Sequence, residues 1–286
     1  MDPRNRHLSN RYSNQSVGNR TWIECFICFN LPGRISNIAS SSNKSRISEN
    51  LVQMMTVGKN LPSEEEKEAT VTAMFDRIAP RYDLVNRLMT FRLDVKWRRK
   101  SIRSLSLPNQ SIVLDIACGT GDFCRDLKKE GFISFGIDLS QGMLSSARTT
   151  SPLVNADALV LPINNASIDG VTCGFALRNF VSLPPFFNEL NRVLRPGGRI
   201  ALLEVDRPSN RLIRLGHNFH FGKIVPILGS ILSDGKAYKY LPESVAYLPE
   251  FDALKEMLLV AGFVDIKKEK LTSGVAQVLT ATKPTN

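Results

Sequence analysis

Two glycines lie between two carboxylates in the stretch VLDIACGTGDF. A strand-like apolar run leads into Gly119-Thr120-Gly121, and Asp115 and Asp122 flank this turn. Glycine permits positive φ and lets a ligand approach the backbone without a Cβ in the way. A phosphate group would suit such a turn, but the neighbouring carboxylates would repel it. The pattern therefore favours a ligand that carries a cation and no phosphate at this position.

The same stretch departs from the dinucleotide-binding pattern Gly-x-Gly-x-x-Gly, because Cys124 stands in place of the third glycine. The amino-acid portion of S-adenosylmethionine carries a cation and lacks phosphate. We therefore expect S-adenosylmethionine as the cofactor, bound at Gly119, Thr120 and Gly121. A nicotinamide-dependent reductase is disfavoured by the same observations.

Further polar residues follow other apolar runs. Asp138 lies nineteen residues after Gly119, a spacing at which an acid accepts hydrogen bonds from ribose hydroxyls. Asp157 and Ala158 follow the next run, where adenine would lie, and we assign Gly174 to the same cofactor site. The alternative for each aspartate is a cap at a helix N-terminus.

The elements that position these residues alternate between apolar strands and helices after Pro108. This alternation predicts a parallel sheet with helices on both faces. Strands joined by the short turn TSG must pair antiparallel, so we expect the sheet to end in a reversed strand. The predicted strands are 111–116, 133–137, 152–155, 168–175, 199–205, 263–270 and 274–282, and the predicted helices are 121–130, 141–149, 183–194 and 252–261.

The first helix is predicted to begin at Ser63, which forms a capping-box pattern with Glu66. It runs toward Ala79, and we expect Pro80 to interrupt it. A second helical stretch follows, with apolar residues at helical spacing (Leu84, Leu88, Phe91 and Val95).

Residues 1–54 are rich in Asn, Ser and Arg and lack periodicity, so we separate them from a folded domain at 63–283. Three accounts compete: a targeting peptide, an extension without ordered structure, or translation that begins at Met54 or Met55. We favour the last two. The segment 207–249 mixes basic and apolar residues and is read as a helical insertion.

Composition excludes several classes of protein. No uncharged apolar run approaches about 18 residues, the length that a membrane span needs. The net charge is +10, yet no stripe of Lys and Arg interleaved with aromatics indicates nucleic acid. Affinity for anionic lipid explains the basic surface more simply. Five cysteines, an odd number, fit a reducing compartment. We expect no metal site, because Cys25-x-x-Cys28 and His217-x-x-His220 lack further ligands nearby.

Five stretches across residues 70–283 resemble, in order, the C-methyltransferases of ubiquinone and menaquinone biosynthesis. They are MFDRIAPRYDLVNRLMTFRLDVKWRR, VLDIACGTGD, GFALRNF, RVLRPGGRIALLEVDRP and AYKYLPESVAYLP. The chain departs from the family pattern at Val85 (usually Met), Asp94 (usually His) and Asp206 (usually Ser). The aspartate in place of His is similar to menaquinone-type enzymes of high-GC Gram-positive bacteria, which favours a naphthoquinol substrate.

The resemblance implies a class I S-adenosylmethionine-dependent methyltransferase fold, an α/β fold with a mostly parallel seven-stranded sheet, a reversed strand and a helical cover. It implies methylation of a ring carbon of demethylmenaquinol, an isoprenoid naphthoquinol, to give menaquinol. The alternatives are a benzoquinol precursor of ubiquinone, or a non-catalytic subunit of a quinone-biosynthesis complex. A cytoplasmic location is expected, and peripheral contact with the inner face of the membrane and an oligomer are left open.

Such a reaction needs a ring hydroxyl to lose its proton. Arg178 and Asn179 follow the fourth strand, so we expect both at the same sheet edge as the cofactor. Arg178 stays protonated and would stabilise a quinolate or orient a water. A salt bridge to a neighbouring carboxylate is its alternative role. Tyr82 and Asp83 are expected to reach the same cavity from the helical cover. The insertion at 207–249 is read as a cap and a route for the isoprenoid tail, or as a hairpin that covers its own core.

Overall fold

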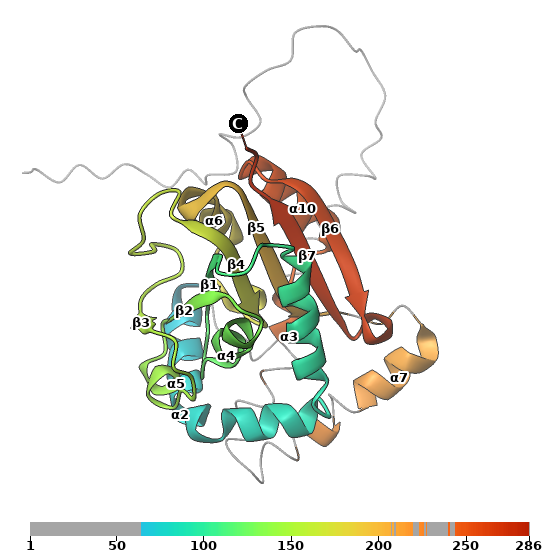
Figure 1. The fold of residues 1–286 in the computed structure, drawn as a ribbon. Helices are drawn as coiled ribbons and strands as arrows, with labels where there is room; N and C mark the ends of the chain where they lie inside the picture. Colours follow the sequence, from blue (N-terminus) through green and yellow to red (C-terminus); the bar gives the residue numbers. More distant parts are fainter. Residues whose placement is uncertain are drawn as a thin grey trace, which may run out of the picture. The chain divides into compact units, whose positions relative to one another are not determined.

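The computed structural model describes residues 64–206, 208, 210–219, 223–225, 227, 240 and 244–285. A seven-stranded sheet lies at the centre of this part of the chain, in the order β3-β2-β1-β4-β5-β7-β6 (Figure 1). The strands are β1 (Ile112–Ile116), β2 (Ile133–Asp138), β3 (Leu153–Asn155), β4 (Ile168–Gly174), β5 (Leu194–Val205), β6 (Val264–Leu271) and β7 (Ala276–Thr282).

Six strands follow the predicted parallel direction, and β7 is the reversed one. It pairs antiparallel with β5 on one side and with β6 on the other. The expected mostly parallel sheet is therefore confirmed. The sheet does not end in the reversed strand, however, because β7 is last in the chain but lies between β5 and β6. The edge is formed by β6.

The central strands are buried on both faces, as parallel strands covered by helices usually are. Along β5, Ile200 and Leu202 join one apolar cluster, and Ala201 and Leu203 join another. Successive side chains of a strand point to opposite faces, so the two clusters lie on opposite sides of the sheet. Helices α6 (Leu183–Val193) and α10 (Phe251–Val260) contribute to the first cluster. Helices α3 (Leu93–Ser104) and α4 (Asp122–Lys129) contribute to the second.

Most predicted boundaries lie within two residues of the observed ones, and two differ by more. The helix expected at 141–149 is the short α5 (Gln141–Ser145), and β5 begins at Leu194 rather than at residue 199. The remaining described elements are the helix α7 (Arg211–Phe219) and the 3-10 turns η1 (Leu177–Asn179), η3 (Val245–Tyr247) and η4 (Thr272–Gly274).

The prediction that Pro80 interrupts the first helix is wrong, because α2 (Glu64–Met89) runs through it. Figure 1 shows that α2 changes direction along its length, as expected where a proline removes one backbone hydrogen bond. Packing maintains the helix on both sides of the proline. Ile78 before it and Val85 after it are both fully buried in one apolar cluster.

None of the described helices is long and apolar enough to cross a membrane. The leader at 1–54 lies outside the described residues, as do Cys25, Cys28 and much of the predicted insertion at 207–249. The accounts given for those segments stay predictions.

Candidate functional site

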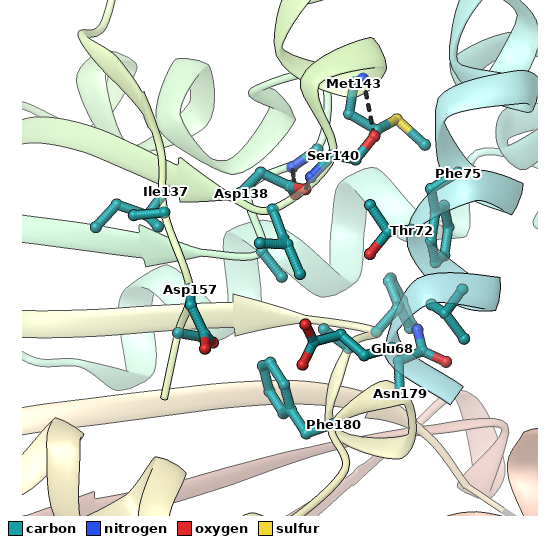
Figure 2. Close-up of a pocket in the computed structure, with 18 of the residues that line it drawn as sticks. Glu68, Thr72, Phe75, Ile137, Asp138, Ser140, Met143, Asp157, Asn179 and Phe180 are labelled. Atoms are coloured by element: carbon teal, nitrogen blue, oxygen red, sulfur yellow. Dashed lines mark hydrogen bonds between the residues drawn. The ribbon is translucent and has the colours of Figure 1, made fainter. Parts of the chain in front are cut away.

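A cavity with an empty volume of about 890 Å³ opens at the carboxyl ends of β1, β2, β3 and β4. This edge is where open α/β sheets bind ligands. The first half of α2 covers the cavity, so that Thr72 and Phe75 face the strand ends (Figure 2).

Of the three residues of the glycine turn, Gly119 lines the cavity. Its φ is +55°, and a Cβ placed on it would meet no atom within 4 Å. The backbone is thus bare toward the cavity, as the sequence predicts. Gly121 has a φ of +81° and caps α4, where a Cβ would come within 2.5 Å of Thr149 Cγ2. Its need for glycine is therefore structural.

Thr120 does not line the cavity, although the sequence assigns it to the cofactor. Its hydroxyl donates to Asp83 Oδ1 at 2.5 Å, and the side chain is buried. Asp83 was expected to reach the same cavity, and it also does not line it. The pair instead joins the glycine turn to α2.

Asp138 lies at the end of β2 and lines the cavity. Its Oδ2 accepts the Gly119 N–H at 2.7 Å, and its Oδ1 accepts the Ser140 N–H at 2.8 Å. Burial raises the pKa of this carboxyl. The helix cap that competed as its role belongs to Ser140, whose Oγ accepts the Met143 N–H of α5.

Asp157, Ala158 and Gly174 all line the same cavity. Asp157 accepts the Leu159 N–H at 2.8 Å. The next helical element, η1, begins only at Leu177, so Asp157 caps no helix. A Cβ on Gly174 would lie 2.6 Å from the Phe123 ring, so glycine is needed there for packing.

Arg178 is buried and does not line the cavity. Its guanidinium forms an ion pair with Glu204 and donates to the Phe175 carbonyl at 2.7 Å and to Ser244 Oγ at 3.1 Å. The structure therefore gives Arg178 the salt bridge that was its alternative role. The neighbouring Asn179 does line the cavity, and its Oδ1 accepts the Tyr240 hydroxyl at 3.4 Å.

Tyr82 lines the cavity from α2, and its ring meets Phe75 edge-on at 6.0 Å between centroids. Tyr82 and Asn179 thus both bring hydrogen-bonding groups to the cavity. Burial raises the pKa of Tyr240, the partner of Asn179, to about 12.

Three carboxylates line the cavity, and none of its described lining residues is Lys, Arg or His. Two of them are Asp138 and Asp157, and the third is Glu68 on α2, whose side chain extends into the cavity (Figure 2). Sequence reasoning missed Glu68. The signal available in the sequence was helical spacing, because Glu68 lies three, four and seven residues before Val71, Thr72 and Phe75, which also line the cavity.

The acids that flank the glycine turn lie elsewhere. Asp115 is fully buried within the sheet and accepts the Thr172 hydroxyl at 2.8 Å. Burial raises the pKa of Asp115 to about 8. Asp122 forms ion pairs with Arg98 and Arg125. The two acids that suggested a cationic ligand therefore do not line the cavity, whereas Glu68, Asp138 and Asp157 do.

Residues 63–283 match the model of the ubiE/COQ5 methyltransferase family. A demethylmenaquinone methyltransferase of Thermus thermophilus is 39% identical over 74% of this chain and 100% of its own length. A ubiquinone/menaquinone biosynthesis C-methyltransferase of Geobacter sulfurreducens is 34% identical over 76% of this chain and 90% of its own.

Solved structures show the fold alone. A SAM-dependent methyltransferase from Thermotoga maritima superposes with a TM-score of 0.54 at 20% identity, over 74% of this chain and 98% of its own. The [4+2]-cyclase SpnF has a TM-score of 0.54 at 17% identity, over 77% of this chain and 97% of its own. A methyltransferase and a cyclase thus share this architecture, so the fold alone does not determine the reaction.

Proposed function

Because the chain belongs to the ubiE/COQ5 methyltransferase family, we propose that it transfers a methyl group from S-adenosylmethionine to a ring carbon of demethylmenaquinol, giving menaquinol. The observation that carries this proposal is the cavity at the strand ends, which is lined by three carboxylates and is open at Gly119. An acidic cavity suits a cofactor with two cationic groups, a sulfonium and an ammonium.

The lining residues fit S-adenosylmethionine in several respects. Each oxygen of Asp138 accepts one backbone N–H and keeps a further lone pair for a ribose hydroxyl. Asp157 and Ala158 are proposed to contact the adenine, and Gly119 to meet the amino-acid portion. Bound there, the cofactor supplies an electrophilic methyl group.

The remaining wall of the cavity is proposed to hold the acceptor ring. Phe75 and Phe180 line it with apolar surface suited to a flat quinol, and Thr72, Tyr82 and Asn179 provide polar groups. Methylation of a ring carbon requires that a ring hydroxyl lose its proton. We propose that Tyr82 and Asn179 contact this oxygen and orient the ring toward the cofactor.

Arg178 has a different role in this proposal from the one expected. It lies beside Asn179 on η1, and its contacts with Glu204 and Ser244 fasten this turn. Arg178 is therefore proposed as a positioning residue that acts through Asn179 and does not contact the substrate.

Methylation of a ubiquinone precursor is the second candidate, because some relatives have names that include ubiquinone. The aspartate that favoured a naphthoquinol, Asp94, is buried against Arg98 at 2.7 Å and does not line the cavity. The relatives named for demethylmenaquinone support the naphthoquinol more directly.

The proposed acceptor carries an isoprenoid tail and resides in a bilayer. The reaction is therefore proposed to occur at the cytoplasmic face of the cell membrane through peripheral contact.

The test is a methylation assay with the purified protein, S-adenosylmethionine and a reduced short-tailed demethylmenaquinol in detergent. Mass spectrometry should detect one added methyl group, and a benzoquinol precursor should react more slowly. The matched control, Gly119→Val, should lose product because a branched side chain enters the cavity. Cofactor binding without methylation of either quinol would favour the non-catalytic subunit instead.

A further inference from the structure

Helix α7 presents a stripe of large apolar side chains to solvent. Leu212, Leu215 and Phe219 are exposed by 80%, 69% and 57%. Their spacing of three and four residues places them on one face of the helix. A single exposed leucine needs no explanation, but an exposed apolar stripe marks an interaction surface.

The charge around this stripe has one sign. Arg211 and Arg214 are exposed on α7, and Lys223 lies 5.9 Å from the centre of the Phe219 ring. The sequence from 207 to 233 contains four Lys and Arg residues and no Asp or Glu. Exposed apolar residues whose charged neighbours in this segment are all basic match a bilayer that carries negative headgroups. An acidic protein partner would match the charge, but it does not require three exposed apolar side chains on one face of the helix.

The chain that follows α7 is fastened to the walls of the cavity. Val225 is fully buried in the cluster formed by the inner face of α2. Tyr240 donates to Asn179, and Ser244 accepts from Arg178. The element with the exposed stripe thus belongs to the same stretch of chain that holds the acceptor side of the cavity.

We propose that α7 docks this protein on an anionic lipid bilayer, with Leu212, Leu215 and Phe219 among the acyl chains and Arg211 and Arg214 at the headgroups. The inference deepens the proposed function, since it identifies the surface through which a membrane-borne acceptor is met. Lipid binding itself requires neither cofactor nor acceptor, so it can be measured separately.

The experiment is sedimentation of the full-length protein with two kinds of vesicle, one of phosphatidylcholine alone and one that also contains phosphatidylglycerol. The protein should bind the second kind, and added salt should weaken binding. Leu215→Glu and Phe219→Glu should each lower the partition coefficient about tenfold or more, since each removes one buried apolar side chain. Arg211→Ser and Arg214→Ser should each lower it about fivefold.

The matched controls lie on α10. Val260 is exposed by 82% and Lys255 is also exposed, so Val260→Glu and Lys255→Ser make the same chemical changes away from α7. Both should bind vesicles like the unaltered protein. Circular dichroism and S-adenosylmethionine binding should show that every variant is folded.

The proposal is overturned if the unaltered protein binds vesicles that contain phosphatidylglycerol no better than vesicles of phosphatidylcholine alone. It is likewise overturned if the α7 variants and the α10 controls bind the vesicles equally well. It is also overturned if sedimentation velocity shows a dimer that Leu215→Glu dissociates, because α7 would then contact a second copy of the chain. Activity of the α7 variants on a short-tailed acceptor in detergent should stay normal. If the unaltered protein also shows no activity on this acceptor, the proposed function is contradicted. Vesicle binding would still be a separate result.

Discussion

Replacing Arg178 by methionine is expected to destabilise the protein more than it impairs the chemical step. Arg178 and Glu204 form an ion pair in which the two side chains are only 6% and 1% exposed. Methionine fills similar space but leaves the Glu204 carboxylate buried without its cation. It also removes the donors to the Phe175 carbonyl and to Ser244 Oγ.

The magnitude follows from this burial. Removing one member of a buried ion pair costs about 3–5 kcal/mol. With an m value of about 2–3 kcal/mol/M in urea, the unfolding midpoint should fall by roughly 1–2 M. Adding Glu204→Gln removes the stranded charge, so the double variant should regain about 2 kcal/mol relative to Arg178→Met alone.

The assay is urea unfolding followed by circular dichroism, together with steady-state kinetics on the folded variants. Arg195→Met is the matched control, because its ion pair with Asp169 is partly exposed and its loss should cost less than about 1 kcal/mol. Arg178→Met with unchanged stability and a kcat lowered about 100-fold or more would refute this reasoning, since a donor to the transition state is worth about that much. Arg178 would then contact the substrate.

Three further predictions concern the cofactor side of the cavity and the sheet beneath it. Asp138→Ala should weaken S-adenosylmethionine binding by about 1.5–3 kcal/mol per charged hydrogen bond lost, measured by isothermal titration; unchanged affinity in a folded variant would contradict the ribose assignment. Gly121→Ala should lower the free energy of unfolding more than Gly119→Ala, whereas Gly119→Ala should weaken cofactor binding more; the reverse order would assign the open backbone to the wrong glycine. Burial raises the pKa of Asp115 to about 8, so the folded state keeps a proton that the unfolded chain releases above about pH 4. Stability should therefore fall as pH rises from about 4 to 8, by up to about 1.4 kcal/mol per pH unit, and Asp115→Asn should remove that slope in urea titrations; an unchanged slope would mean that Asp115 is ionised in the folded protein.

The sheet could be predicted from sequence because its causes are local. A continuous apolar run such as 112–116 forms a buried strand, and the turn that follows needs the positive φ that Gly119 and Gly121 adopt. Asp138 is the last residue of β2, and Asp157 lies two residues after β3 ends. Parallel strands present their carboxyl ends at one edge. The place of both acids at the cavity therefore follows from chain order alone.

Tertiary structure decided which partner each polar side chain found. Thr120 lies in the predicted turn, yet its hydroxyl bonds Asp83, 37 residues earlier. Arg178 directly precedes a lining residue, yet its guanidinium turns to Glu204, 26 residues later. A buried charge is stable only when it is paired, and the position of the pairing carboxylate depends on how separate strands and turns pack.

Tertiary packing also decided that α2 continues through Pro80. A proline in the interior of a helix removes one backbone hydrogen bond, so sequence alone predicts a break at Pro80. Burial of Ile78 and Val85 in a common cluster favours one continuous helix. The same packing places Glu68 over the strand ends. Helical spacing shows which residues share a face with Glu68, but only packing decides that this face points into the cavity. The sequence by itself determined the strands, the glycine turn and the acids at strand ends, because these depend on neighbours along the chain. Only the tertiary structure decided which charges face the cavity and which are paired elsewhere, because that choice depends on contacts between residues far apart in the chain.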